Sequence, residues 1–217
     1  MADVPRRPLP SRLYAIVDAD IAARANWHVP DLADAYLQAG VRLLQIRAKD
    51  AAARDVLAWT EAISRLAGDA WVIVNDRVDI ALVAGTRHVH LGQDDLPVPE
   101  ARELLGPDAV IGLSTHTPAQ IDAACGEPID YLAVGPVFGT QTKATGYEAV
   151  GLAGVRQAHA AAHAAGVPVV AIGGITLDTA PDVIAAGASS VAVITDLLHE
   201  ANPGARARAY VERLSRV

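Results

Sequence analysis

The chain has 217 residues, which is long enough to bury one large hydrophobic core. Hydrophobic residues make up 52% and charged residues 20%, so the chain is globular rather than disordered. The net charge of −7 argues against a general nucleic-acid or membrane surface. Cys125 is the only cysteine, which excludes an internal disulfide and a cysteine-based metal cluster.

The N-terminal residues 1–10 carry Arg6, Arg7 and three prolines but no apolar segment typical of a secretory signal. No run in the sequence approaches the roughly 18–20 apolar residues of a membrane span. We therefore expect a cytoplasmic protein with a single domain over residues 1–217, of which 1–10 form a flexible extension. The sequence allows a homo-oligomer but does not determine the oligomeric state.

Short apolar runs and helix-length segments alternate along the whole chain. In chain order, the predicted strands are 13–17, 43–46, 71–74, 88–91, 109–113, 131–134, 169–172 and 190–194. The predicted helices between and after them are 31–38, 52–67, 97–105, 119–125, 152–165, 179–186 and 203–214. Start and stop residues support them: Thr117 and Asn202 stand at N-cap positions, and Gly40 follows the first predicted helix.

This alternation predicts an α/β fold of the (β/α)8 TIM-barrel type, because eight strands alternate with helical segments at a spacing of about 20–30 residues. A doubly wound open sheet has the same periodicity and is the alternative. Polar residues gather just after successive strands, and a barrel would bring all of them to one rim. Their distribution therefore favours the barrel.

Two glycines after the seventh predicted strand, Gly173 and Gly174, are candidates for a phosphate site together with Ile194-Thr195 after the eighth. Glycines let the backbone approach a phosphate closely, and these two loops form the recurrent phosphate site of TIM barrels. The alternative is that the glycines only form a tight turn.

Two acids, Asp76 and Asp95, follow the third and fourth predicted strands and are candidate ligands of Mg²⁺. Mg²⁺ is commonly bound by one or two carboxylates together with water and substrate phosphates. In the alternative interpretation Asp76 caps a helix that begins at Arg77, and Asp95 is a loop charge. The neighbouring Asp94 is expected to be a solvated bystander.

Other polar groups can join the same rim. Gln45, Arg47 and Lys49 alternate along the end of the second strand, so their side chains share one side. Residues 135–146 form a long Gly/Thr-rich loop that contains Lys143 and is expected to cover a ligand. His116, close to Ser114, is the one histidine expected near a substrate, whereas His88 and His90 lack a third metal ligand at matching spacing.

The ordered set of these motifs resembles the thiamine phosphate synthase family. The motifs that carry the resemblance cover nearly the whole chain: residues 45–49 (QIRAK), 74–76 (VND), 90–95 (HLGQDD), 112–117 (GLSTHT), 135–138 (GPVF), 140–143 (TQTK) and 171–175 (AIGGI). Each motif is weak alone, but the set in this order is specific.

The resemblance implies a transferase that joins hydroxymethylpyrimidine diphosphate to hydroxyethylthiazole phosphate and releases pyrophosphate. It implies Mg²⁺ on Asp76 and Asp95 and small molecules as substrates. The charge and composition already argue against nucleic acid and a membrane as partners, and the sequence allows a homo-oligomer. The implied ligands of the pyrimidine diphosphate are Gln45, Arg47, Lys49, Asn75, Ser114 and Lys143. The implied residues around the thiazole phosphate are Thr140, Thr142, Gly174, Ile194 and Thr195.

The chemistry fits this implied set, because charge separates as diphosphate leaves a benzylic-type carbon and no protein nucleophile is required. Mg²⁺, Arg47, Lys49 and Lys143 can stabilise the leaving group, and Ser114 completes the implied catalytic set. Thr195 stands where Ser is common, which preserves the hydroxyl.

Three alternatives remain open from sequence. A thiazole tautomerase of the same barrel family would use His116 as acid and base. A regulatory barrel would bind a thiazole or thiamine phosphate without catalysis. Another phosphate-binding barrel, such as an isomerase or epimerase, would need an acid/base pair at the rim. The acid pair and Lys143 favour the synthase.

Overall fold

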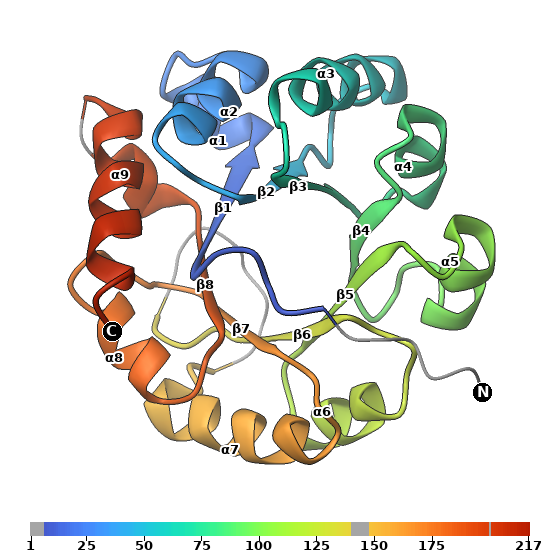
Figure 1. Ribbon diagram of the computed structural model, residues 1–217, viewed down its shortest axis with the longest axis vertical. Helices are drawn as coiled ribbons and strands as arrows, with labels where there is room; N and C mark the ends of the chain where they lie inside the picture. The colour runs from blue at the N-terminus through green and yellow to red at the C-terminus, as the bar shows by residue number, and fades with distance from the viewer. Residues whose placement is uncertain (1–6, 140–147, 200) are drawn as a thin grey trace.

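Each predicted apolar run forms one strand of a closed parallel barrel in the computed structural model, which describes residues 7–139, 148–199 and 201–217 (Figure 1). The strands follow one another around the barrel in sequence order, and β8 closes it by pairing with β1. Their bounds are β1 Leu13–Asp18, β2 Leu43–Arg47, β3 Trp71–Asn75, β4 His88–Leu91, β5 Val110–Thr115, β6 Tyr131–Val134, β7 Val169–Ile172 and β8 Ser190–Val193. The predicted TIM barrel is confirmed, and the open-sheet alternative is wrong.

All seven predicted helices are present in the outer ring, with bounds within two residues of the prediction (Figure 1). They are α2 Val29–Gln38, α3 Ala53–Leu66, α5 Val98–Leu105, α6 Pro118–Cys125, α7 Gly151–Ala164, α8 Ala180–Ala185 and α9 Pro203–Leu214. The two predicted N-caps act as expected: Thr117 accepts a hydrogen bond from the backbone N–H of Gln120, and Asn202 accepts one from that of Ala205. Three short helices among the described residues are not in the predicted set: α1 Ala19–Arg24, α4 Val78–Ala84 and the 3₁₀ helix η1 Thr195–Leu198. Of these, α4 enters the sequence analysis only in the alternative interpretation of Asp76.

Two apolar layers pack against the strands, because successive side chains of a strand point to opposite faces. The outward-facing side chains form the large core beneath the helices. The inward-facing side chains fill the barrel, so its interior is a packed core rather than a pore. The inner layer consists of Tyr14, Ile16, Leu43, Ile73, Val110, Tyr131, Ala133, Val170 and Ala192.

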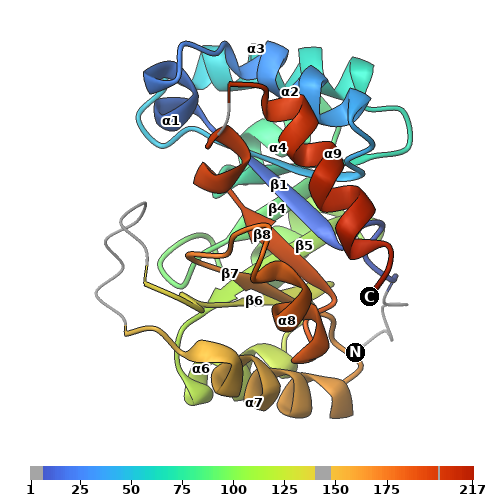
Figure 2. The same cartoon turned by 90° about the vertical axis from the view of Figure 1, so that its left-hand side faces the viewer.

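The two ends of the barrel differ in what they carry. At the end where the strands begin, Arg12 donates a hydrogen bond to the carbonyl of Val217, so the C-terminus lies there (Figure 2). The opposite end collects the loops that follow the strands, and it is the end where TIM barrels carry their active sites.

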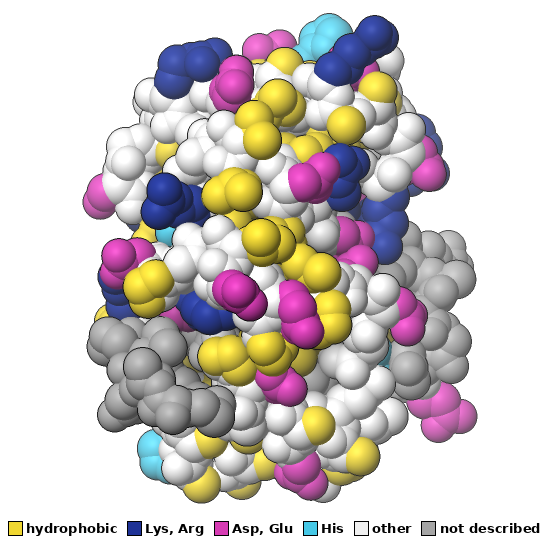
Figure 3. All heavy atoms as spheres, turned by 90° about the vertical axis from the view of Figure 1, so that its right-hand side faces the viewer, with side chains coloured by type: hydrophobic (Ala, Val, Ile, Leu, Met, Phe, Trp, Pro, Cys, Tyr) yellow, Lys and Arg dark blue, Asp and Glu magenta, His cyan; other side chains and the backbone are white. Residues whose placement is uncertain are grey.

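The outer surface over α4 and α5 carries exposed hydrophobic side chains between charged ones (Figure 3). Val83 is 68% exposed and Leu104 55%, the largest exposed fractions among the big apolar residues described. No helix in the described part of the chain is long and apolar enough to span a membrane.

Candidate active site

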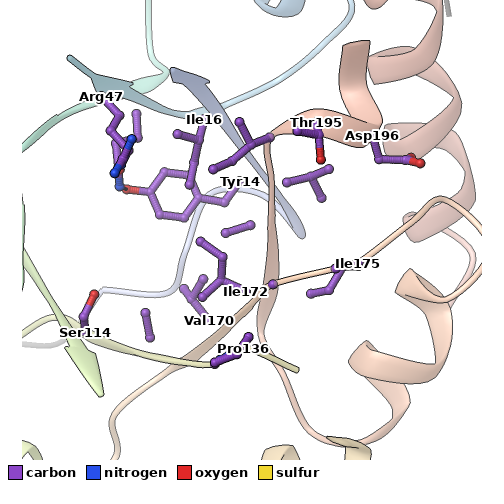
Figure 4. A pocket seen from close by; sticks show the side chains of 18 of the residues that line it. Tyr14, Ile16, Arg47, Ser114, Pro136, Val170, Ile172, Ile175, Thr195 and Asp196 are labelled. Atoms are coloured by element: carbon purple, nitrogen blue, oxygen red, sulfur yellow. Dashed lines mark hydrogen bonds between the residues drawn. The ribbon is translucent and has the colours of Figure 1, made fainter. Parts of the chain in front are cut away.

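A cavity of about 350 Å³ opens at the ends of the barrel strands (Figure 4). Arg47 and Ser114 lie on one side of it, and Thr195 and Asp196 lie on the other. Apolar side chains such as Ile172 separate the two sides. The cavity therefore has two polar regions joined by an apolar one, and each polar region can hold a polar group of a ligand.

The first polar region contains most of the residues implied for the pyrimidine diphosphate. Gln45, Arg47, Asn75 and Ser114 come from the ends of β2, β3 and β5 and all line the cavity. Gln45 is buried in the barrel, with only 2% of its surface exposed. Strand alternation and barrel closure together bring these residues from separate strands to one place.

Arg47 is held by a carboxylate that the sequence analysis did not identify. It forms an ion pair with Asp18, at the end of the neighbouring strand β1. Asp18 also accepts a hydrogen bond from the backbone N–H of Ile21 at 3.1 Å and so caps α1. The side chain of Asp18 is 3% exposed, so the guanidinium is anchored at the wall of the cavity by a buried charge.

The predicted acid pair, Asp76 and Asp95, lies at the rim beside Lys49, and none of the three lines the cavity itself. The Lys49 ammonium is 3.3 Å from a carboxylate oxygen of Asp76. Asp95 accepts a hydrogen bond from the backbone N–H of Gly92 at 2.6 Å. Burial raises the pKa of the Asp95 carboxyl, and the nearby Asp76 raises it further, whereas Gly92 and Lys49 lower it.

The interpretation of Asp76 as a helix cap is wrong. The N-cap residue of α4 is Arg77, which has no side-chain cap, and its guanidinium binds Asp79 instead. The backbone of Asp76 is in the left-handed region with φ of 62°, an uncommon conformation for a non-glycine residue. Two carboxylates near each other at the rim supply the hard oxygen ligands that Mg²⁺ prefers, and water or a diphosphate would complete its coordination.

A buried chain of hydrogen bonds runs from Gln45 to Ser114 through the barrel. Gln45 Nε2 is 2.7 Å from Tyr14 Oη, which is 2.9 Å from Tyr131 Oη. Tyr131 Oη is 3.0 Å from His90 Nδ1, and His90 Nε2 is 2.9 Å from Ser114 Oγ. Burial raises the pKa of both tyrosines, so both phenols stay protonated.

Gly112 makes room for this chain. A Cβ atom at that position would lie 2.1 Å from the ring of Tyr131. The ring of His90 also stacks on Tyr131, with the two ring centroids 5.6 Å apart. The absence of a side chain at Gly112 therefore lets the Tyr131 ring occupy the barrel interior.

His116 lines the cavity, as expected of a histidine near a substrate. Its Nδ1 lies 2.7 Å from the carbonyl oxygen of Gly135. A carbonyl oxygen only accepts, so Nδ1 carries a proton and donates it. This contact fixes the orientation of the imidazole ring at the cavity wall.

The second polar region is built by residues 173–176 after β7 and 194–196 after β8. We call these two loops the phosphate loops after the expectation from the sequence, and the phosphate site itself stays a prediction. Gly173 and Gly174 have φ of 104° and 65°. A Cβ atom on Gly174 would lie 2.7 Å from the carbonyl oxygen of Gly139. Both glycines are therefore required by backbone conformation and by close packing, and both line the cavity with Ile194 and Thr195.

Asp196 joins the two phosphate loops to α9. Its carboxylate accepts a hydrogen bond from the backbone N–H of Leu177 at 3.1 Å, from Arg206 Nη2 at 2.9 Å and from Tyr210 Oη at 2.6 Å. Burial and the adjacent Asp196 raise the pKa of Tyr210. Sequence patterns gave no sign that Asp196 links these segments, because Asp196 belongs to no motif and its partners are distant in sequence.

Three predicted site residues, Thr140, Thr142 and Lys143, lie outside the described residues. The residues that sequence analysis missed are Tyr14, Asp18, His90, Tyr131, Asp196 and His199. His90, which the sequence analysis set aside for lack of a third metal ligand, both packs on Tyr131 and lines the cavity. A polar residue in the last inward position of its strand is the signal that would have found Asp18 and His90.

Comparisons with known proteins agree with this geometry. Residues 13–197 match the family model described as thiamine monophosphate synthase. The chain belongs to the thiamine monophosphate synthase family. It is 46% identical over 204 residues to the thiamine-phosphate synthase of Anaeromyxobacter dehalogenans, covering 93% of this chain and 87% of that one.

Other relatives of the family give the same result. The thiamine-phosphate synthase of Koribacter versatilis is 42% identical over 206 residues, covering 94% of this chain and 95% of its own. A solved structure of thiamine phosphate pyrophosphorylase from Pyrococcus furiosus superposes with a TM-score of 0.84 at 28% identity, covering 94% of this chain and 96% of that one. The resemblance seen in the sequence motifs is therefore confirmed at the level of the family and of the fold.

Proposed function

We propose that this chain is a thiamine-phosphate synthase, which joins hydroxymethylpyrimidine diphosphate to hydroxyethylthiazole phosphate and releases pyrophosphate. Membership of the family supports the reaction. The observation that carries the proposal for this chain is the cavity with two polar regions, since the reaction brings together a diphosphate and a monophosphate.

The pyrimidine diphosphate binds in the region of Gln45, Arg47, Asn75 and Ser114. The diphosphate extends toward the rim, where Lys49 and the acid pair lie. Arg47 and Lys49 stabilise the negative charge that develops as the diphosphate leaves, and Ser114 donates a hydrogen bond to it. Lys143 of the loop that follows β6 completes this set of donors.

Asp76 and Asp95 hold Mg²⁺ in this proposal. Their carboxylates lie close enough for Asp76 to raise the pKa of Asp95, and a divalent cation between them would relieve that repulsion. Mg²⁺ held by these two carboxylates would supply positive charge next to the leaving diphosphate. Lys49, which contacts Asp76, keeps that carboxylate oriented toward the rim.

The thiazole phosphate binds at the phosphate loops. Gly174, Ile194 and Thr195 surround its phosphate, with Thr140 and Thr142 at its border. The apolar wall of Ile16, Val170 and Ile172 contacts the thiazole ring and keeps water from the reacting carbon. The substitution proceeds by loss of pyrophosphate and attack of the thiazole nitrogen on the exposed methylene.

The experiment that tests this proposal is an assay of the purified chain with both substrates and Mg²⁺, in which thiamine phosphate is detected directly. Asp76→Ala and Asp95→Ala are expected to lose product formation, as is the wild-type protein without Mg²⁺. Asp94→Ala is the matched control, because this exposed acid adjoins Asp95 and should leave the rate unchanged.

A thiazole tautomerase would use His116, whose side chain lines the cavity. An arm of the assay with thiazole phosphate alone separates the two reactions. Tautomerisation without thiamine phosphate formation by folded wild-type protein would reject the synthase, and loss of that activity in His116→Ala would establish the tautomerase.

A further inference from the structure

The hydrogen-bond chain from Gln45 to Ser114 crosses the barrel interior and connects two residues of the first polar region of the cavity. It uses side chains of five strands, β1, β2, β4, β5 and β6. Tyr14 and Tyr131 are no more than 1% exposed, and His90 is 8% exposed. Because water has little access to these side chains, each hydroxyl or ring N–H in the chain must donate its proton to the next residue.

The end at Gln45 sets the direction of the first link. Gln45 Nε2 is an amide nitrogen and only donates, so Tyr14 Oη accepts from it. The one proton of Tyr14 is then directed to Tyr131 Oη, its other hydrogen-bond partner in the barrel. Tyr131 has accepted one bond, so its own proton is directed to His90 Nδ1.

The last link follows from the first three. A neutral imidazole whose Nδ1 accepts carries its proton on Nε2. His90 Nε2 therefore donates to Ser114 Oγ, 2.9 Å away. The hydroxyl proton of Ser114 is left to point away from His90, and Ser114 lines the cavity.

We propose that this chain of hydrogen bonds is directional and that it presents the Ser114 hydroxyl to the substrate as a donor rather than an acceptor. Tyr14, Tyr131 and His90 are positioning residues that act through Ser114. Resting on the proposed function, the acceptor is an oxygen of the pyrimidine substrate's diphosphate, on which negative charge grows as it leaves.

The direction also depends on which group stands at position 45. A carboxylate there could only accept from Tyr14, which would reverse every link and turn the Ser114 hydroxyl toward His90. Gln45→Glu preserves the shape of the side chain and changes this property. It is therefore the substitution that separates direction from packing.

The first test measures the tautomer of His90 in the full chain without substrate, by ¹⁵N NMR of the histidine rings, with His90→Gln used to assign the signal. The wild-type protein is expected to show the Nε2–H tautomer, and Gln45→Glu is expected to show Nδ1–H. An Nδ1–H or doubly protonated ring in the wild-type protein, or an unchanged tautomer in Gln45→Glu, overturns the proposal.

The second test is a double-mutant cycle in kcat for thiamine phosphate formation with Tyr131→Phe and Ser114→Ala. Tyr131→Phe is expected to lower kcat about tenfold, the scale of one hydrogen bond to a charged group. In the Ser114→Ala background the same substitution should change kcat by less than about twofold, because both act on one bond. Equal losses in the two backgrounds overturn the proposal.

The matched control for the cycle is Tyr36→Phe. Tyr36 is buried outside the barrel interior, and its hydroxyl has no hydrogen-bond partner among the described residues. The kcat of the Tyr36→Phe variant should equal that of the wild-type protein. A wild-type protein that forms no thiamine phosphate would reject the proposed function, whereas the tautomer of His90 tests the chain of hydrogen bonds independently of any reaction.

Discussion

Asp196→Asn tests whether the contacts behind the phosphate loops control thiazole phosphate binding. In the wild-type protein the carboxylate contacts Arg206, Tyr210 and the backbone N–H of Leu177. The amide removes the charge that balances the guanidinium and can accept fewer of these bonds. We expect the loop after β7 to lose its fixed distance from the loop after β8.

The magnitude follows from burial. Breaking one side of a fully buried ion pair costs about 3–5 kcal/mol. The side chains of Arg206 and Asp196 are 17% and 11% exposed, and this partial exposure reduces the cost to about 2–3 kcal/mol. For a chain of this size that corresponds to a fall of about 4–12 °C in Tm.

The effect on the site is expected to be selective. KM for the thiazole phosphate should rise about tenfold, because the misplaced loop loses roughly one good hydrogen bond to the phosphate. KM for the pyrimidine diphosphate should stay within twofold, since that substrate binds on the other side of the cavity. Steady-state kinetics with each substrate varied in turn, together with thermal unfolding, measures both quantities.

Asp130→Asn is the matched control. Asp130 accepts from Arg102 Nη2 at 2.7 Å and from the backbone N–H of Ile111 at 2.8 Å, and it precedes β6 at the end of the barrel away from the site. We expect a similar loss of stability with both KM values unchanged. Equal changes of KM in the two variants, or an equal rise for both substrates in Asp196→Asn, would refute the reasoning.

Three further predictions concern the acid pair, the phosphate loops and Arg47. Asp95→Asn should raise the Tm of the metal-free protein by about 1–3 °C through lost repulsion, and abolish stabilisation by Mg²⁺. The raised pKa of Asp95 means that the folded state binds a proton more tightly than the unfolded state. The free energy of unfolding should therefore fall as pH rises from the usual aspartate range through that pKa. The same slope of unfolding free energy against pH in Asp95→Asn would contradict this. Gly174→Ala should abolish thiazole phosphate binding in calorimetry, because a Cβ atom there meets neighbouring atoms. Gly68 also has a positive φ, of 58°, but no atom lies near its Cβ position, so Gly68→Ala should cost only about 1 kcal/mol of unfolding free energy and keep binding. Equal binding by the two variants would contradict the packing argument. Asp18→Asn should lower kcat about tenfold, because Arg47 loses the carboxylate that holds it. Asp69→Asn, which removes the exposed ion pair with Arg42, is the control and should leave kcat unchanged. Full activity in Asp18→Asn would show that Arg47 needs no anchor.

The sequence predicted the barrel because its signals are local and repeat eight times. The strands 88–91, 131–134 and 169–172 were predicted with their observed bounds, since each apolar run is flanked by turn residues. Helix α4 was missed as an element: it has only seven residues and no side-chain cap. Helix α1 was missed because it has only six residues and follows β1 directly, with no intervening turn residue.

Motifs located most of the cavity but not the residues that orient it. Gln45, Asn75, Ser114 and Gly174 were found because short patterns place them after strands. Tyr14 and Tyr131 have the pattern of ordinary core residues, and only the closed barrel brings their hydroxyls together. Long-range partners such as Asp18 with Arg47 carry no sequence signal in a single chain.

If one cavity joins the two substrates, thiamine phosphate and pyrophosphate must form in equal amounts, so the stoichiometry of the two products tests the proposed function. Folded wild-type protein with Mg²⁺ is incubated with both substrates or with each alone, and thiamine phosphate and pyrophosphate are quantified in parallel. We expect equal amounts of the two products with both substrates and no thiamine phosphate with either one alone. Absence of thiamine phosphate when both substrates are present would contradict the proposed function.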